Sequence, residues 1–188
     1  MKENKFETKA IREGLKTSQE QEHSAAIYLT SSFTFDSAEQ AAQRFANEEQ
    51  GNVYSRFTNP TVEAFQDKLA SLEGAESCLA TASGMSAIFA TIMALSKTGD
   101  HIVASRGMFG TTTVLLNTIV NRFGIEVTFV DLPDLVTWKD SIQSNTKLFI
   151  LETPSNPLGE VVDLRALSVI SKKPVSYTHL TLPTNPRV

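Results

Sequence analysis

Residues 77–88 read SCLATASGMSAI, and this stretch decides the fold class. Its apolar start predicts a short strand over 77–80, its small residues predict a tight turn, and a helix is expected over about 85–97. Ser83 is a natural N-cap, which leaves the backbone N–H groups of Gly84 and Met85 free to point outward. Gly84 has no Cβ, so a bound group can approach its backbone closely. The stretch therefore predicts either a phosphate site at a helix start or an ordinary strand-to-helix connection capped by Ser83.

A regular alternation of strands and helices follows this stretch. Strands are expected near 101–105, 125–130 and 147–151, and helices over about 111–123, 133–143 and 163–173. Strands that alternate with helices predict an α/β fold with a mostly parallel sheet, covered on both faces. In such sheets ligands bind beyond the carboxyl ends of the strands, so every turn at those ends is a candidate site.

Two of these turns carry candidate binding residues. Phe109 is flanked by glycines after the strand at 101–105, so its ring can lie over the sheet edge and stack on a planar ligand. A phenylalanine that fills the top of the core is the alternative. The turn after 147–151 contains two prolines, which make it rigid and aim Glu152 and Asn156. Asn156 can donate to a ligand oxygen, or it can form an Asx turn before Pro157.

The first part of the chain is expected to form an arm without its own core. Residues 1–35 show little periodicity. Asp36 is then expected to cap a helix that reaches about residue 49, with Glu39 as its capping-box partner.

A second helix of this region is expected to begin at Pro60, with Asn59 as its N-cap, and to stop at Gly74. The segment before it is expected to be extended. Tyr54 and Arg56 occupy alternate positions there, so both side chains can face one way. A tyrosine hydroxyl and an arginine fork that point together can hold an anion, whereas a solvated loop with a stacking tyrosine is the alternative.

Composition excludes several classes of protein. The 188 residues are 41% hydrophobic and 20% charged, which indicates a globular protein, with one domain as the default count. A net charge of −4 without a basic stripe argues against a nucleic-acid partner, and no apolar run is long enough to span a membrane. Cys78 is the single cysteine and is expected to be a buried residue of a core strand. A single cysteine and a polar N-terminal segment without the apolar stretch of a signal peptide lead us to expect a reducing cytoplasm. The three histidines are too scattered to form a metal site.

Three motifs together resemble one known family. The sequences YSRFTNPT at 54–61, SGMSA at 83–87 and ETPSNP at 152–157 are similar to the cysteine/methionine-metabolism branch of fold-type I pyridoxal-phosphate enzymes. The resemblance covers about residues 6–174 and implies the N-terminal part of a three-layer αβα fold. It implies an arm and cofactor clamp over 1–60, the first part of the large cofactor-binding domain over 61–174, and a tail of other origin over 175–188.

The resemblance also implies pyridoxal 5′-phosphate as the cofactor and residues that hold its phosphate. The N–H groups of Gly84 and Met85 would bind the phosphate within the subunit. Tyr54 and Arg56 would reach the phosphate of the cofactor in a neighbouring subunit, so a homotetramer is implied.

Two further residues would contact the ring of the cofactor. Phe109 would stack on the pyridine ring, and Asn156 would bond the phenolic oxygen. Many relatives carry tyrosine where Phe109 stands. Because Phe109 has no hydroxyl, a proton transfer assigned to that tyrosine cannot occur here.

The implied reaction is a γ-replacement in methionine biosynthesis, in which sulfide replaces the succinate of O-succinylhomoserine and homocysteine forms. The sequence FGTT at 109–112 is most similar to the enzymes of this reaction. Cystathionine γ-synthases and the lyases of the family share the other motifs and stay open as alternatives. The substrate would thus be a small amino acid, and the compartment the cytoplasm.

The family's cofactor-bonding lysine, the aspartate at the pyridine nitrogen and the substrate-binding arginine are expected beyond residue 174. Asp163 and Lys172 stand in contexts that do not match those motifs. We therefore expect no catalytic residue among the 188 and an inactive fragment. The tail at 175–188 is expected to be a cloning or sequencing artefact in place of a core strand. Unpaired apolar strand edges would then leave the fragment marginally stable.

Overall fold

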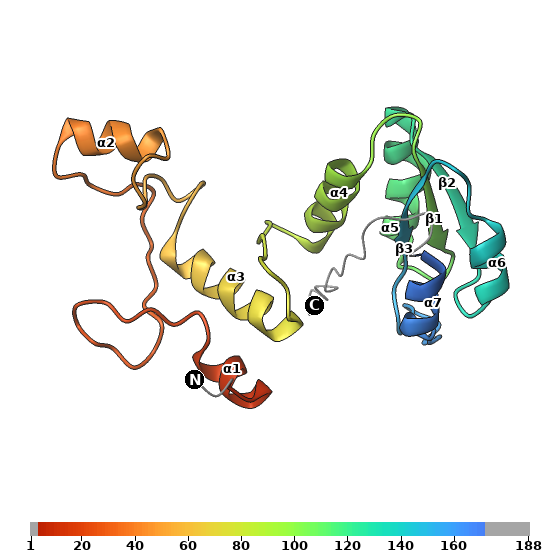
Figure 1. Cartoon of the computed structure of the whole chain (residues 1–188), viewed down its shortest axis with the longest axis horizontal. Helices are drawn as coiled ribbons and strands as arrows, with labels where there is room; N and C mark the ends of the chain where they lie inside the picture. The colour runs from red at the N-terminus through yellow and green to blue at the C-terminus, as the bar shows by residue number, and fades with distance from the viewer. Residues whose placement is uncertain (1–3, 172–188) are drawn as a thin grey trace. The chain divides into compact units, whose positions relative to one another are not determined.

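The computed structural model describes residues 4–171, and the chain divides into two compact units, Met1–Ala80 and Thr81–Val188 (Figure 1). Each unit is described by itself. The tail expected at 175–188 and Lys172 lie outside the described residues, as does the end of the helix expected over 163–173.

The second unit is built on a three-stranded parallel sheet in the order β2-β1-β3. The strands are β1 (His101–Ser105), β2 (Glu126–Val130) and β3 (Thr146–Ile150). In register, Ile102 of β1 lies opposite Val127 and Leu148. All five residues of β1 are buried, because the strand has a neighbour at each edge and a helical layer on each face. The α/β fold with a parallel sheet is confirmed.

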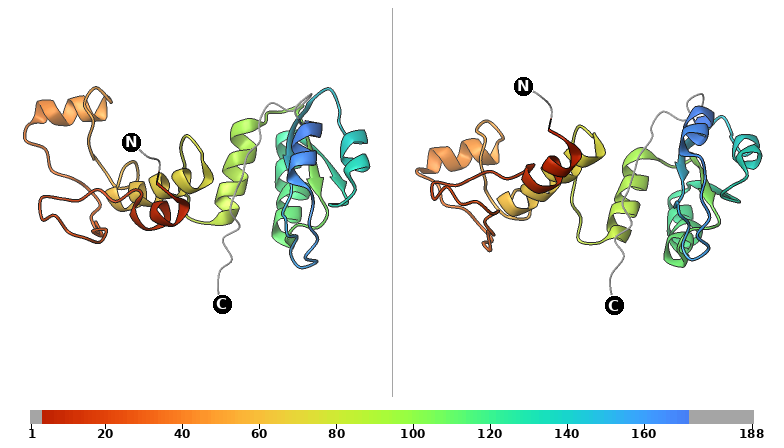
Figure 2. Two further views of the ribbon diagram at one scale, coloured as in Figure 1. Left: turned by 60° about the horizontal axis from the view of Figure 1, so that its bottom comes forward. Right: turned by 90° about the horizontal axis from the view of Figure 1, so that it is seen from below.

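Helices cover both faces of this sheet, which gives three layers (Figure 1 and Figure 2). Side chains of β1 alternate between the faces: Ile102 and Ala104 belong to one core cluster and Val103 to the other. The first cluster contains residues of α4 (Gly84–Leu95) and of the helical run after β1. The second contains Trp138 of α6 (Leu135–Asp140) and Leu167 of α7 (Leu164–Ser171).

The sequence predicts one regular α-helix after β1, over about 111–123. The structure has three short helical segments there instead. They are α5 (Gly110–Val114), a π-helical turn η1 (Leu115–Ile119) and a 3₁₀ turn η2 (Val120–Phe123). The N–H of Val120 donates to the carbonyl of Leu115, five residues back. In and directly after the π-helical turn, Leu115, Leu116 and Val120 are all buried in the first core cluster, which packs against the sheet.

The prediction of a strand over 77–80 is wrong. These residues form no ladder, and the N–H of Ala80 donates instead to Oε1 of Gln66 at 2.8 Å. Leu79 is 78% exposed and Cys78 is half-buried, so Cys78 is not a residue of a core strand. An apolar run becomes a strand only where a neighbouring strand takes up its backbone hydrogen bonds, and the sequence pattern does not specify that neighbour.

The first unit contains α1 (Phe6–Arg12), α2 (Ala38–Phe45) and α3 (Pro60–Glu73). The limits predicted for α3 are confirmed, with Asn59 as N-cap, Pro60 in the first turn and Gly74 in the left-handed conformation at φ 64°. The sequence did not predict α1, which packs on α3. Gly14 follows α1 and lies close against α3. Its φ is 73°, and a Cβ there would meet the Ala64 carbonyl oxygen at 2.2 Å, so a glycine is needed at this position.

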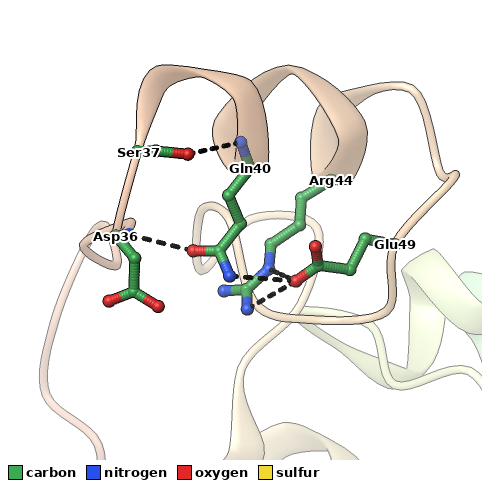
Figure 3. Close-up of polar contacts among 5 residues, drawn as sticks. All are labelled: Asp36, Ser37, Gln40, Arg44 and Glu49. Atoms are coloured by element: carbon green, nitrogen blue, oxygen red, sulfur yellow. Dashed lines mark hydrogen bonds and ion pairs between the residues drawn. The ribbon is translucent and has the colours of Figure 1, made fainter.

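Ser37, and not Asp36, caps α2 (Figure 3). Ser37 Oγ accepts the N–H of Gln40 at 3.1 Å, and Gln40 Oε1 accepts the N–H of Asp36 at 2.9 Å. Gln40 Nε2 and Arg44 Nε both donate to Glu49 Oε1, which closes the turn after the helix. The cap thus lies one residue later than expected, because Ser-x-x-Gln over 37–40 also fits the capping-box sequence, although Gln40 reaches the N–H of the residue before the cap.

No helix within residues 4–171 combines the length and the apolar character needed to cross a membrane.

Asn59 connects the arm to α3, and we expect its replacement to loosen the arm. Its Oδ1 caps Thr61, while its Nδ2 donates to the Tyr28 carbonyl at 3.1 Å and to Ser55 Oγ at 2.9 Å. Asn59→Asp keeps the cap oxygen and removes both donations, which should cost about 1–2 kcal/mol. Limited proteolysis of residues 28–33 should accelerate. Asn52→Asp is the matched control, and equal cleavage of both variants would contradict the role given to Asn59.

His101 should make the second unit sensitive to mild acid. The ring is fully buried, with Nδ1 2.8 Å from Thr146 Oγ1 and Nε2 2.9 Å from Thr128 Oγ1. Burial holds the pKa of His101 below its ordinary value of 6.5, and the nearby Glu126 carboxylate offsets this only in part. The unfolded chain therefore binds more protons, so stability is complete above pH 6.5 and falls as the pH drops below it.

Urea unfolding followed by the fluorescence of the single tryptophan, Trp138, measures this effect between pH 7.5 and 5. We expect the midpoint to fall with pH in the parent protein and in His23→Gln, which changes an exposed histidine. His101→Gln should flatten the pH dependence. A slope that His101→Gln leaves unchanged would assign the acid sensitivity to other groups.

Candidate functional site

The start of α4 presents two backbone donors. Ser83 has extended backbone angles, and its Oγ accepts the N–H of Ser86 at 3.1 Å. The N–H groups of Gly84 and Met85 come before the first intrahelical hydrogen bond, which Ala87 donates to the Ser83 carbonyl. Neither group has an acceptor among the described residues. Two free donors at the positive end of a twelve-residue helix can bind an anion.

Weak contacts with the sulfur of Met85 connect this helix start to the start of α5. The hydroxyls of Thr111 and Thr112 lie 3.5 Å and 3.9 Å from Met85 Sδ. Thioether sulfur is a weak acceptor, so these contacts show that the two helix starts are close together and contribute little to the stability of the fold. They place the amino end of α4 beside the turn that follows the carboxyl end of β1. No motif of the sequence predicts this contact.

Phe109 presents its ring beside that turn. The residue precedes the first residue of α5, is 52% exposed and belongs to neither core cluster. The alternative, a phenylalanine that fills the top of the core, is therefore wrong. The backbone is held from the turn after β3, because the N–H of Phe109 donates to Glu152 Oε2 at 3.0 Å. The exposed ring is available to a planar ligand.

Asn156 lies in the turn after β3 and has a free side chain. It is exposed and forms no hydrogen bond with the described residues, so the alternative of an Asx turn is wrong. The turn is closed instead by Ser155, whose N–H donates to the Glu160 carbonyl at 2.8 Å and whose Oγ accepts the N–H of Glu160 at 2.9 Å. Both X-Pro bonds of the turn, before Pro154 and before Pro157, are cis.

Tyr54 and Arg56 come together in the first unit, but in a turn and not in an extended segment as predicted. Tyr54 forms an isolated antiparallel bridge with Ser32, and its carbonyl accepts the N–H groups of Phe57 and Thr58. The guanidinium of Arg56 lies 4.7 Å from the centre of the Tyr54 ring. It forms no ion pair with a carboxylate within residues 4–171. The turn thus presents a stacked, uncompensated cation.

Four of the six predicted residues, Gly84, Met85, Phe109 and Asn156, lie in the second unit. The contacts above gather the elements that carry them at the carboxyl edge of the sheet. Tyr54 and Arg56 lie in the first unit, so their reach to a phosphate stays a prediction. Within the second unit, Arg106, which follows β1, pairs with Asp131 at 3.3 Å. The described residues contain no group of three or more histidine, cysteine, aspartate or glutamate side chains suited to a metal ion.

Together these groups fit a phosphorylated aromatic ligand. Free amides at a helix start suit its phosphate, an exposed aromatic ring suits its planar part, and an unpartnered carboxamide suits a ring oxygen. Pyridoxal phosphate, the cofactor expected from the sequence, is a ligand of this chemical class.

Comparison with known proteins identifies the family of the chain. The family model described as Cys/Met metabolism PLP-dependent enzyme matches residues 7–181, and so extends past the boundary expected at 174. The chain is 51% identical over 166 residues to an O-succinylhomoserine sulfhydrylase of Pseudomonas aeruginosa, an alignment that covers 88% of this chain and 41% of that enzyme. It is 48% identical over 145 residues to an L-methionine gamma-lyase of Fusobacterium nucleatum, covering 77% and 37%.

A solved structure shares the fold. It is a Campylobacter jejuni protein described as an O-acetylhomoserine (thiol)-lyase, which contains N'-pyridoxyl-lysine-5'-monophosphate at position 205. The TM-score is 0.83 at 33% identity, over 91% of this chain and 42% of that one. This chain spans about two fifths of the length of these relatives. The fold is that of fold-type I enzymes, the cofactor of the family is pyridoxal phosphate, and the chain belongs to the Cys/Met metabolism family of PLP-dependent enzymes.

Proposed function

We propose that this chain, as part of a longer polypeptide, serves a PLP-dependent γ-replacement in which sulfide displaces succinate from O-succinylhomoserine and homocysteine forms. The observation that carries the proposal is the pair of free amides at the start of α4, joined through Met85 to the turn that presents Phe109. The 51% identity to an O-succinylhomoserine sulfhydrylase supports the choice of reaction.

The residues of the second unit would bind and orient the cofactor. Gly84 and Met85 would donate their N–H groups to the phosphate, Phe109 would stack on the ring, and Asn156 would donate to the ring oxygen. Pyridoxal phosphate, when bound, supplies an electron sink for charge that develops on the carbon atoms of an amino acid. A stacked ring and a fixed phosphate keep that sink in one plane relative to the substrate.

We infer that the cofactor-bonding lysine lies outside residues 4–171. No described lysine lies at the start of α4 or in the turns after β1 and β3. Lys97 follows the opposite end of α4, and Lys147 lies near the amino end of β3. The binding groups named above therefore require a lysine from another part of the protein for turnover.

We also infer a homotetramer in the cytoplasm. In this assembly Tyr54 and Arg56 would reach the cofactor phosphate of a neighbouring subunit. The exposure of both side chains and the absence of a carboxylate partner for Arg56 in the described part support that role. A single, half-buried cysteine fits a reducing compartment.

An elimination, in which no sulfide is added, is the second candidate, since the chain is 48% identical to an L-methionine gamma-lyase. Assays of the purified full-length gene product separate the two reactions. With O-succinylhomoserine and sulfide we expect homocysteine and succinate in equal amounts. O-acetylhomoserine, methionine and cystathionine serve as competing substrates. Release of thiol from methionine at a higher kcat/KM than sulfide transfer would overturn the γ-replacement.

The phosphate role of the α4 start is tested by deleting a single donor. Gly84→Pro removes one N–H at the first helical position, where proline is well tolerated, and the extended backbone of Ser83 suits the residue before a proline. Gly84→Ala keeps the N–H and is the matched control. We expect Gly84→Pro to weaken pyridoxal phosphate binding about tenfold or more, the effect of one lost hydrogen bond to a charged group.

Fluorescence titration of the full-length apo protein with pyridoxal phosphate measures this affinity, and circular dichroism checks that the helix content is unchanged. If Gly84→Pro binds the cofactor as tightly as the parent protein does, the phosphate does not bind at this helix start; Gly84→Ala separates the effect of an added Cβ from the loss of the donor.

A further inference from the structure

We propose that Glu152 is a positioning residue: its carboxylate holds the backbone of Phe109 and thereby sets the plane in which the Phe109 ring meets the cofactor. This inference rests on the proposed function, in which Phe109 stacks on the cofactor ring.

The hydrogen bond itself joins two turns that are far apart in sequence. Phe109 N–H donates to Glu152 Oε2 at 3.0 Å across 43 residues. Phe109 follows β1 and Glu152 follows β3, and these strands are direct neighbours in the parallel sheet. A carboxylate acceptor makes this a charge-assisted bond, which is stronger than a bond between neutral groups.

The N–H of Phe109 needs an acceptor from outside the helix start. Phe109 stands at the position before α5, and in a capping box the N–H of that residue bonds a glutamate or glutamine side chain three residues later. That position holds Thr112 here, and α5 has no side-chain cap bond. Glu152 therefore provides the acceptor oxygen that a capping-box residue would bring.

Side-chain packing does not fix the ring in its place. Phe109 is 52% exposed and is not part of either core cluster, so packing in the core does not define the orientation of its ring. With the ring free, its direction depends on the backbone from which it projects. Among the described residues, the side chain that bonds the backbone at Phe109 is that of Glu152.

The frame behind this contact is close-packed. A Cβ on Gly107 would lie 3.1 Å from Ser155 Cβ and 3.1 Å from Glu160 Oε2, so the turns after β1 and β3 already meet there. Glu160 thus places a second carboxylate near the same turn, without a hydrogen bond to Phe109. Glu160 is the matched control, since it has the same chemistry, lies in the same turn and lacks the contact.

The test uses the full-length holoenzyme with three substitutions of Glu152. Glu152→Gln keeps the length and an acceptor oxygen, Glu152→Asp keeps the charge but is one methylene too short, and Glu152→Ala removes the acceptor. We expect Asp and Ala to weaken pyridoxal phosphate binding about tenfold. They should also reduce the visible circular dichroism of the bound cofactor, which reports its asymmetric surroundings. Glu160→Ala and Glu160→Asp should behave as the parent protein does, and Glu152→Gln, which keeps an acceptor without the charge, should lose much less than Glu152→Ala.

Hydrogen exchange of residues 107–112 in the apo form gives a readout that needs no cofactor. Exchange should accelerate most in Glu152→Asp and Glu152→Ala, less in Glu152→Gln, and not in the Glu160 variants. Unchanged exchange together with unchanged circular dichroism overturns the proposal, as does accelerated exchange with parental cofactor binding, which would make the contact merely structural. If Glu152→Ala does not fold, the comparison of Asp with Gln decides. A parent protein that binds no pyridoxal phosphate fails at the proposed function, and its exchange data still show whether Glu152 holds the turn.

Discussion

Parallel pairing of β1 on both of its edges is the constraint on which the second unit depends. A strand with two parallel neighbours directs its carboxyl end to the same edge as theirs, so the turns after β1 and β3 must meet. The burial of the whole of β1 follows from this central position, as does the division of its side chains between two core clusters. The site is thus assembled by sheet order from residues that are distant in the sequence.

Features decided by neighbouring residues were predictable from the sequence. Asn59, Pro60 and Gly74 set the limits of α3 through capping and backbone conformation, which are local. Strands β1 to β3 were placed within one residue, because turns bound each apolar run. Two of the failures were not local. The run at 77–80 lacked a partner strand, and α1 is a helix whose packing depends on α3, 50 residues later. The cap of α2 was misplaced because two adjacent residues both satisfy the capping rule.

The candidate site divides in the same way. Ser83 and the two amides after it follow from a local cap, and the structure places them as predicted. The sequence could not decide whether Phe109 faces the core or the ligand, since glycines around an aromatic residue permit both. Tyr54 and Arg56 were expected to be neighbours by strand alternation and are neighbours through a turn and ring stacking. The prolines after Glu152 predicted a rigid turn that aims its side chain. Its bond to Phe109 depends on the order of the strands, which the local sequence does not specify.

The contact between Phe109 and Glu152 has a consequence for the order of assembly during translation. A ribosome completes β1 and the Phe109 turn well before β3 exists, and in that interval the Phe109 amide has no carboxylate within reach. Contacts between distant residues form only after the entropic cost of closing the loop between them has been met. The Phe109 turn therefore reaches its final conformation late, after β3 has paired with β1. The helix start at Gly84 is complete from the moment its own cap forms.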